Sequence, residues 1–515
     1  MKQSTTQNSK NIAIIGSGFG GLSAACYLAQ AGHKVTVYEK NEQLGGRASV
    51  KRADWFTRDM GPSRYLMPDL FEEFFSDFGK DISDYLSLTK LDPSYKVYFK
   101  DDLKHPMIDV SSDIEKNRET FESLEPGSTD TLHTYLQSAK IQYDIGINWF
   151  VKKNYNSIFD FINLETLINA FKLKITTNIG KYVKRYFASD YMQKIMQYPM
   201  IFLWSPLYQT PAMYNLMTYV DFGMWVWYPQ WGMWSLVQAL VQLGTELWVE
   251  YRTDSEVTKI HTTPVEYKWR TLWKNKTSKV TALELQSGEI VQVDHIVSNA
   301  DMHWTETQLL DTADQTYDEA YRDKHVLAPS GFCIYLGLDR KVDWLDHHTL
   351  IFNQDREKSN KEIFGSAEYP SDPSYYICCP SKSDPNVAPE WSENLFVLVP
   401  FPSRVTMDDD AKQAYADKIL TDAERILGQD LRSHIVYQEI FWPDEFTSRY
   451  HAYGGNALSG WAHLFRQTAI FRPTNVSKKV EWLFYAWGYT NPGIWVPICI
   501  ISGKLASERV GENMI

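Results

Sequence analysis

The first forty residues alternate between apolar runs and short glycine-rich or polar breaks. Asn11 to Ile15 (NIAII) is apolar and rich in β-branched residues, which predicts a buried strand. Leu22 to Ala31 (LSAACYLAQA) has helical spacing of apolar residues and is stopped by Gly32. Lys34 to Glu39 (KVTVYE) predicts a second strand that ends in an acid. The chain therefore opens as a strand, a helix and a strand.

The turn between that strand and that helix reads Gly-Ser-Gly-Phe-Gly-Gly, from Gly16 to Gly21. Gly16 allows a tight turn, Gly18 lets the backbone approach a pyrophosphate, and Gly21 lets the helix pack close to the strand. The free N–H groups at the helix N-terminus attract phosphate. Glu39 stands where a carboxylate accepts hydrogen bonds from a ribose diol. The pattern predicts a dinucleotide site, whereas a glycine-rich turn in another α/β protein is the structural alternative.

Two further glycine motifs decide between dinucleotides. Gly45-Gly46-Arg47-Ala48 and Asp59-Met60-Gly61-Pro62 resemble the extended flavin fingerprint of amine-oxidase-like flavoproteins. In that interpretation the glycines lie against the cofactor and Arg47 supplies a permanent cation near phosphate. Dehydrogenases that use NAD do not need this series, so the resemblance implies FAD.

Further motifs follow along the rest of the chain. They are Ser205-Pro206 with Pro211-Ala212, Tyr228-Pro229 before Leu236, Ser298-Asn299-Ala300-Asp301, Gln467-Thr468 with Phe471-Arg472-Pro473, Gly488 to Gly493, Val496-Pro497 and Ser502-Gly503-Lys504. Together these segments resemble the carotenoid (phytoene) desaturase family, and because the motifs run from residue 11 to 510, the resemblance spans nearly the whole chain.

This resemblance implies an α/β fold in which a Rossmann-like FAD-binding domain is interleaved with an α+β substrate-binding domain. We expect residues 9–90, 225–305 and 477–510 to form the FAD-binding domain and residues 91–224 and 306–476 to form the substrate and membrane-facing domain. Within 225–305 we expect a helix over Leu236–Gln242 and a strand that ends near Val257–Ile260. The cofactor-binding residues that the resemblance implies are Gly16, Gly18, Phe19, Gly20, Gly21, Glu39, Lys40, Gly46, Arg47, Asp59, Gly61, Pro62, Val257, Asn299, Gly488, Gly493, Val496 and Pro497.

Composition narrows the function classes further. The 515 residues carry 52 Lys and Arg against 64 Asp and Glu, a formal charge of −12, which argues against a nucleic-acid binder. The five cysteines show no paired metal-ligand spacing and are too few for a disulfide scaffold, so we expect a reducing compartment and no metal. The polar start of the chain has no secretory signal, and no apolar run is long enough to span a bilayer.

Tryptophan occupies several positions where the family has glycine. The chain has 18 Trp and 27 Gly, and glycine at about 5% is below the usual ~7%. Because a glycine position commonly has backbone against cofactor or a positive φ, tryptophan there is improbable. We hypothesise that the source cell reads UGA as glycine and that these codons are written here as tryptophan, the alternative being a lineage with a Trp-rich pocket. The suspect positions are Trp55, Trp225, Trp231, Trp234, Trp248, Trp487 and Trp495.

Residues 140–194 form a basic segment within an acidic chain. They carry nine Lys and Arg against four acids, and a helical face collects Phe161, Leu164, Leu167, Ile168 and Phe171. A basic amphipathic helix suits either a membrane surface or a core-facing position with a solvated basic face. The family resemblance favours the membrane, because its C30 or C40 polyene substrate is insoluble. We therefore expect a cytoplasmic protein associated peripherally with the cytoplasmic membrane.

The resemblance implies FAD-dependent desaturation of a carotenoid precursor such as phytoene. A C–C bond loses a hydride to flavin N5 and a proton from the adjacent carbon, and the protein must orient cofactor and polyene in an apolar tunnel. Quinone or oxygen would reoxidise the flavin. The aromatic residues Tyr208, Tyr214, Tyr219, Phe222 and Trp227 are candidates for stabilising cationic charge near the flavin, with core packing as the alternative. The catalytic acid or base stays unassigned.

Three alternatives remain open on the sequence. A flavin-dependent isomerase of the same family would form no new double bond, and an oxygenase or ketolase relative would add oxygen. A non-catalytic prenyl-lipid-binding escort protein on the same fold would bind lipid without flavin. The intact glycine turn with Glu39 and Arg47 argues against the escort.

Overall fold

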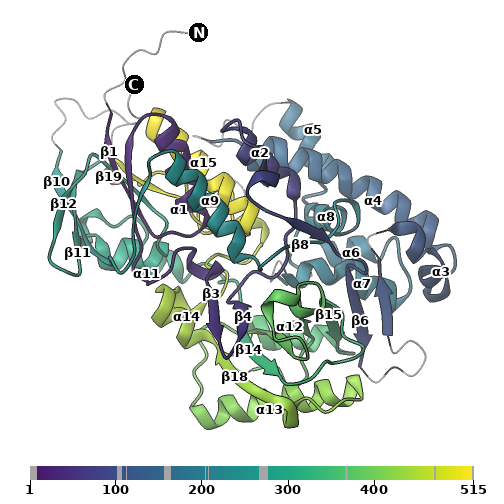
Figure 1. Ribbon diagram of the computed structural model, residues 1–515. Coiled ribbons are helices and arrows are strands. Elements are labelled where there is room, and N and C mark those ends of the chain that lie inside the picture. The colour runs from purple at the N-terminus through teal and green to yellow at the C-terminus, as the bar shows by residue number, and fades with distance from the viewer. Residues whose placement is uncertain are drawn as a thin grey trace.

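The computed structural model describes residues 9–100, 102, 107–111, 113–155, 164–202, 205–206, 208–265, 276–365, 369–468 and 471–512. Two sheets organise these residues (Figure 1). The first is a five-stranded parallel sheet in the order β20-β13-β1-β2-β9. Its strands are β1 (Asn11–Ile15), β2 (Lys34–Tyr38), β9 (Glu250–Arg252), β13 (His295–Ser298) and β20 (Leu483–Tyr485). Strands from all three segments expected to bind the cofactor therefore meet in one sheet.

Three helices far apart in the sequence cover one face of this sheet. Helix α1 (Phe19–Gln30) packs against α9 (Trp234–Glu246) and α15 (Val496–Glu512), and Figure 1 shows them side by side in purple, teal and yellow. Close packing needs small residues, since a Cβ on Gly503 of α15 would lie 2.8 Å from the Ala24 amide nitrogen of α1. Strand β1, the turn after it and helix α1 lie where the apolar pattern predicts a strand, a turn and a helix.

A small antiparallel sheet covers the opposite face. It consists of β10 (Val257–Pro264), β11 (Ser278–Leu285) and β12 (Ile290–Gln292), with β19 (Val480–Glu481) beside β11. Leu283 and Leu285 pack there against Ala13 and Ile15 of β1. The expectation that a strand ends near Val257–Ile260 is wrong, because β10 begins at Val257 and its pairing with β11 continues to Pro264.

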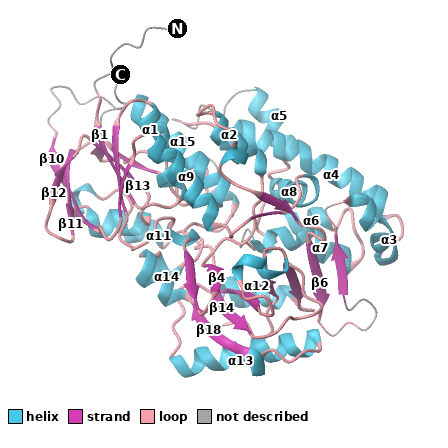
Figure 2. Cartoon of the chain, in the orientation of Figure 1, coloured by secondary structure: helices cyan, strands magenta, loops and turns pink. Residues whose placement is uncertain are grey.

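The second large sheet has seven strands in the order β18-β14-β17-β16-β15-β6-β7. All neighbours are antiparallel except β15 and β6. The strands are β6 (Tyr95–Phe99), β7 (Met107–Val110), β14 (Ser330–Leu338), β15 (His348–Phe352), β16 (Tyr375–Cys378), β17 (Glu393–Phe401) and β18 (Ile435–Phe441). Residues from 91–224 and 306–476 therefore share this sheet. Figure 2 shows it in magenta, apart from the first sheet.

Helices lie on both faces of the seven-stranded sheet. Helix α13 (Asp409–Leu427) packs its apolar side on one face, where Ile419 and Leu420 join a buried cluster with strand residues. The other face packs against a largely helical region. The helices of that region are α3 (Ile114–Leu124), α4 (Ser128–Ile145), α5 (Leu164–Lys172), α6 (Ile179–Val183), α7 (Asp190–Phe202) and α8 (Leu216–Gly223). Of the amphipathic face expected in the basic segment, Phe161 lies outside the described residues.

The remaining elements connect these layers. They are the hairpin β3 (Val50–Ala53) and β4 (Phe56–Asp59), the pair β5 (Leu88–Lys90) and β8 (Trp227–Pro229), and the helices α2 (Pro68–Ser76), α10 (Met302–Trp304), α11 (Glu319–Arg322), α12 (Arg356–Gly365) and α14 (Pro443–Tyr450). The described residues contain no helix with the length and apolar character needed to cross a bilayer.

Candidate functional site

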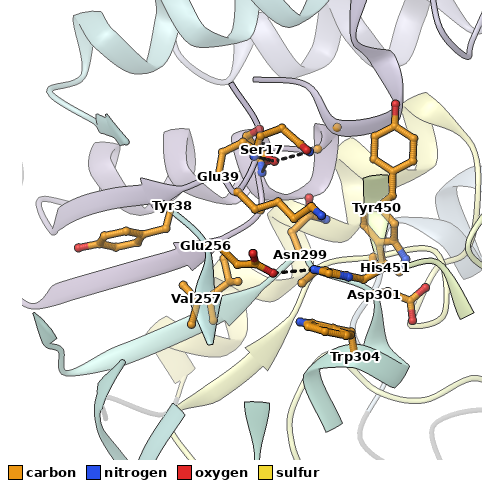
Figure 3. A pocket seen from close by; sticks show the side chains of 18 of the residues that line it. Ser17, Tyr38, Glu39, Glu256, Val257, Asn299, Asp301, Trp304, Tyr450 and His451 are labelled. Carbon is orange, nitrogen blue, oxygen red and sulfur yellow. Dashed lines mark hydrogen bonds and ion pairs between the residues drawn. The ribbon is translucent and has the colours of Figure 1, made fainter. Parts of the chain in front are cut away.

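A cavity of about 70 Å³ opens beside the turn between β1 and α1. Its lining combines this turn with the ends of β2 and β13, the start of β10 and the end of α14, as Figure 3 shows. Gly16, Gly18, Glu39, Lys40, Gly46, Arg47, Val257 and Asn299 of the predicted set line it. The carboxyl ends of parallel strands meet at one edge of a sheet, which is where α/β proteins of this kind bind dinucleotides.

Glu39 is held at this cavity by four hydrogen bonds. Its carboxylate accepts the amide (2.9 Å) and hydroxyl (2.6 Å) of Ser17 and both the backbone and side-chain N–H groups of Asn41. Glu39 is 4% exposed and lies directly after β2. Hydroxyl groups of a bound ribose can replace the side-chain donors, so the position fits the role that its spacing predicts.

The glycines of the turn make room in different ways. A Cβ on Gly18 would lie 2.7 Å from Asn299 Oδ1, and one on Gly21 would collide with the Gly16 carbonyl. A Cβ on Gly20 would lie 2.7 Å from the Ala486 carbonyl oxygen. Gly18 therefore borders the cavity with backbone alone. Gly20 and Gly21 line neither this cavity nor the larger one described below, and they serve the close packing of α1.

Arg47 and Asp301 add a second pair of charged groups to the site beside Glu39. Burial lowers the pKa of the Arg47 guanidinium, and the Asp301 carboxylate opposes that shift. Burial likewise raises the pKa of Asp301 to about 6, with Arg47 opposing. Arg47 Nε has no hydrogen-bond partner among the described residues. A buried guanidinium with spare donors is suited to an anionic group such as a phosphate.

Sequence reasoning missed the wall opposite the glycine turn. The rings of Trp304 and His451 stack with centroids 3.6 Å apart, and His451 Nε2 lies 2.8 Å from the Glu256 carboxylate (Figure 3). Burial lowers the pKa of His451. Flat aromatic surface with polar neighbours suits a heterocyclic base. Trp304 lies three residues after Asp301 of the recognised motif, but no sequence signal connects either of them to His451.

A second, larger cavity of about 260 Å³ lies between Gly18 and Arg47 on one side and the seven-stranded sheet on the other. Phe19, Gly61, Pro62, Gly488, Val496 and Pro497 of the predicted set line it. Its wall is mostly apolar, with side chains such as Phe71, Phe396 and Leu398, and its charged lining residues are Arg47 and Arg64. Arg64 faces Asp221 at 4.0 Å. The cavity fits an apolar substrate beside a cofactor ring.

Not every predicted residue reaches a cavity. Gly493, with φ +142, packs on Arg472 and lines neither of the two. The five aromatic residues proposed near the flavin face, Tyr208, Tyr214, Tyr219, Phe222 and Trp227, are also absent from both linings. The structure also brings together His347, His348 and Cys378, whose possible metal-ligating atoms lie within 4.8 Å of one another and which the sequence analysis did not single out.

Asp59 lies outside both cavities and caps a helix instead. Its carboxylate accepts the amides of Met233 (2.7 Å) and Trp234 (3.0 Å) at the start of α9. Burial raises the pKa of Asp59 from 3.8 to about 7. Between these two pKa values the folded protein keeps the proton that the unfolded chain has lost. The free energy of unfolding therefore falls as the pH rises from about 4 to about 7.

We expect Asp59→Asn to flatten this pH dependence, because an amide does not ionise. Its single oxygen keeps only one of the two N–H bonds, which different carboxylate oxygens accept in Asp59, so the variant is also expected to be less stable at both pH values. Melting temperatures at pH 5 and pH 8 measure it, and their difference is expected to shrink. Asp81→Asn is the matched control. Asp81 is exposed, and the Ser83 hydroxyl and amide lower its pKa, so it titrates outside this pH range. An unchanged slope in Asp59→Asn contradicts the assignment.

Known proteins resemble this chain in sequence and in fold. The flavin containing amine oxidoreductase family matches residues 19–511. A carotenoid 3,4-desaturase of Haloarcula japonica is 41% identical over 506 residues, covering 98% of this chain and 99% of its own length. A zeta-carotene-forming phytoene desaturase of Myxococcus xanthus is 31% identical, covering 98% and 95%. An oxidoreductase structure from Methanosarcina mazei, with 15% identity and TM-score 0.60, shares the fold over 98% of this chain and all of its own.

Proposed function

Because the chain belongs to the flavin containing amine oxidoreductase family, we propose that it is an FAD-dependent desaturase of a carotenoid precursor such as phytoene. The observation that carries this is that two cavities lie side by side and share Gly18 and Arg47 in their linings. One offers a carboxylate and a bare glycine turn, and the other offers apolar walls. A cofactor with a polar nucleotide end and a flat redox ring has these two requirements.

In this proposal Glu39 holds the ribose of FAD, Gly18 and Arg47 face its phosphates, and residues 488–497 border its ring. When bound, FAD would supply the acceptor for the hydride that the polyene loses along with a proton from the adjacent carbon. The apolar wall at Phe71 and Phe396 orients the polyene and keeps water out. No carboxylate of the described chain lines this cavity, so the protein's main contribution is orientation and exclusion of water.

Expression in cells that accumulate phytoene tests the function. We expect a new pigment that is lighter than its precursor by two hydrogens for each step, with longer-wavelength absorbance. A product of unchanged mass would indicate an isomerase, and added oxygen would indicate an oxygenase. A purified protein that binds lipid but stays colourless in the presence of FAD would indicate the escort function. Each of these outcomes contradicts the proposal.

We also propose that segments 9–90, 225–305 and 477–510 bind the cofactor while 91–224 and 306–476 bind substrate and membrane. Quinone or oxygen serves as the electron acceptor in this proposal. The membrane part rests on the described end of segment 140–194. Phe171 is 87% exposed and Ile168 46% exposed on α5, close to exposed basic residues. Apolar side chains beside cations suit a surface of anionic lipid at the cytoplasmic face of the membrane.

Charge removal tests this surface. We expect a variant with Gln at four exposed basic positions to bind anionic liposomes at least tenfold more weakly, since each cation near such a surface contributes ~1 kcal/mol. These positions are Lys172, Lys181, Lys184 and Arg185. Lys174 is left intact because its ammonium donates to Ser138 Oγ and the Tyr182 hydroxyl inside the fold.

The matched control removes four exposed lysines elsewhere, Lys34, Lys80, Lys341 and Lys358. Co-sedimentation of that variant is expected to match the parent protein. Equal losses in both variants would mean that net charge, and not this surface, governs binding. Unchanged co-sedimentation of the first variant refutes the proposed membrane contact.

A further inference from the structure

Seven described tryptophans have a backbone conformation that L-residues rarely adopt. Their φ angles lie between +65° and +112°, in Trp55, Trp225, Trp231, Trp248, Trp344, Trp482 and Trp495. Only seven described residues of all other non-glycine types have positive φ. Bulky residues are outliers in this region because their Cβ meets the backbone. Positive φ is thus concentrated in one of the rarer residue types of the chain.

The β3–β4 hairpin gives the first independent argument. Ala53 pairs with Phe56, so Asp54 and Trp55 form a two-residue loop with φ +49° and +68°. Such a type I′ turn requires positive φ at both positions, and Asp-Gly is among its preferred sequences. Trp55 is 91% exposed, so its ring gains no packing to offset the strain. The backbone of this turn is therefore the one that an Asp-Gly sequence adopts.

The end of helix α9 gives the second independent argument. The Trp248 amide donates to the Thr245 carbonyl (3.0 Å) and the Val249 amide to the Gly244 carbonyl (2.9 Å). This pair of bonds defines a Schellman cap, whose left-handed position is usually glycine. Helix α1 ends with the same pair of bonds, and there the position is Gly32 with φ +91°. Trp248 is 91% exposed.

Trp495 stands at the cofactor site itself. Its φ of +112° lies beyond the narrow left-handed region open to L-residues, roughly +50° to +70°. It directly precedes α15 and lines the larger cavity. A residue without a side chain would satisfy the backbone here and enlarge the space beside Val496 and Pro497.

Trp487 has no unusual φ but lies in the path of the cofactor. A Cβ on Gly18 would be 3.2 Å from its ring, and it lines both cavities. Its indole Nε1 is buried and has no partner in the described part of the chain. Arg47 lies over the same ring, with 5.2 Å from its guanidinium carbon to the ring centroid. The indole therefore stands between the two cavities and is part of the wall of each.

We propose that the natural protein has glycine at these eight positions and that FAD passes over position 487 from the smaller cavity into the larger. The passage rests on the proposed function, whereas the identity of the residues does not. Trp344 and Trp482 join the set on backbone conformation alone, beyond the positions that the family motifs point to. Trp234 stays outside it, since its backbone begins α9 and its indole donates to the Leu44 carbonyl.

The codons and the peptides of the source cell test the residue identities. We expect UGA at all eight positions, and peptides whose masses correspond to glycine there. Trp227 and Trp304 are the internal controls. Trp227 lies in β8 and its indole donates to the Met224 carbonyl, while Trp304 stacks on His451, so both are expected to be UGG and tryptophan. UGG at Trp55, Trp248 and Trp495 overturns the proposal.

The passage is tested by FAD titration of two proteins. Both have glycine at the seven positive-φ positions, and they differ only by Trp487→Gly. Calorimetry is expected to give at least tenfold tighter FAD binding to the protein with glycine at 487. Equal affinities overturn the passage. If neither protein binds FAD while the peptides contain glycine, the residue identities stand and both the passage and the proposed function fail.

Discussion

A chain with glycine at the seven positive-φ positions is expected to be more stable than the tryptophan chain by about 7 kcal/mol. A bulky residue in the left-handed region costs ~1–3 kcal/mol, and the greater freedom of glycine in the unfolded chain offsets up to ~1 kcal/mol of it. The sites are separated along the chain, so the effects add approximately. Because the free energy of unfolding of a typical protein is only ~5–15 kcal/mol, a difference of this size is comparable with the whole stability of the chain.

Urea unfolding of the two chains measures this difference. The tryptophan chain is expected to unfold at much lower urea or to be insoluble, since Trp55 and Trp248 expose large apolar rings. Trp227→Gly is the matched control, and it is expected to destabilise the chain because this ring packs beside a buried cluster and its indole makes a hydrogen bond. Equal unfolding midpoints for the two chains contradict the expectation.

Gly18→Val in the glycine-restored protein is expected to weaken FAD binding at least ~100-fold, about 2.7 kcal/mol. A side chain at this position points at Asn299 Oδ1 and fills the edge where the cavities meet. The φ of Gly18 is −65°, so the backbone conformation itself tolerates the substitution, but Asn299 must shift to admit the new side chain. A melting temperature of the variant separates this cost to folding from the loss of binding.

Absorbance of flavin in the purified protein is the readout. Gly365→Val is the matched control, since Gly365 ends α12 and a Cβ there has nothing within 4 Å. That variant is expected to keep its flavin. Retention of flavin by Gly18→Val, with its usual absorbance, would mean that the pyrophosphate does not lie over this turn.

The N-terminal unit was predictable because short-range chemistry determines it. Apolar alternation, the glycine turn and the terminal acid each act within a few residues, and β1, α1 and β2 lie where they indicate. Gly18, Glu39 and Arg47 also reach a shared cavity as their motifs imply. The family motifs supplied the remaining flavin segments by resemblance, and not through any physical signal in the spacing.

The rest of the site could not be predicted, because it depends on contacts between segments that are far apart in the sequence. Glu256, Trp304 and His451 come from three distant segments, and nothing in the local sequence indicates that they converge. Asp59 belongs to a flavin-type motif, yet its carboxylate is used by the first turn of α9, about 175 residues later. The motifs marked Trp55 and Trp248 as departures from the family pattern, and the backbone adds a physical reason, because both have positive φ whereas Trp227 does not. Trp344 and Trp482 match no motif, so only their φ angles mark them.

The account depends on direct electron transfer from a polyene to FAD bound across these two cavities. Glycine-restored holoprotein, mixed without oxygen or quinone with phytoene in anionic liposomes, provides the most direct measurement. We predict that the flavin absorbance bleaches in proportion to a product that has lost two hydrogens. Flavin that stays oxidised, while the recovered phytoene keeps its mass, would contradict the account.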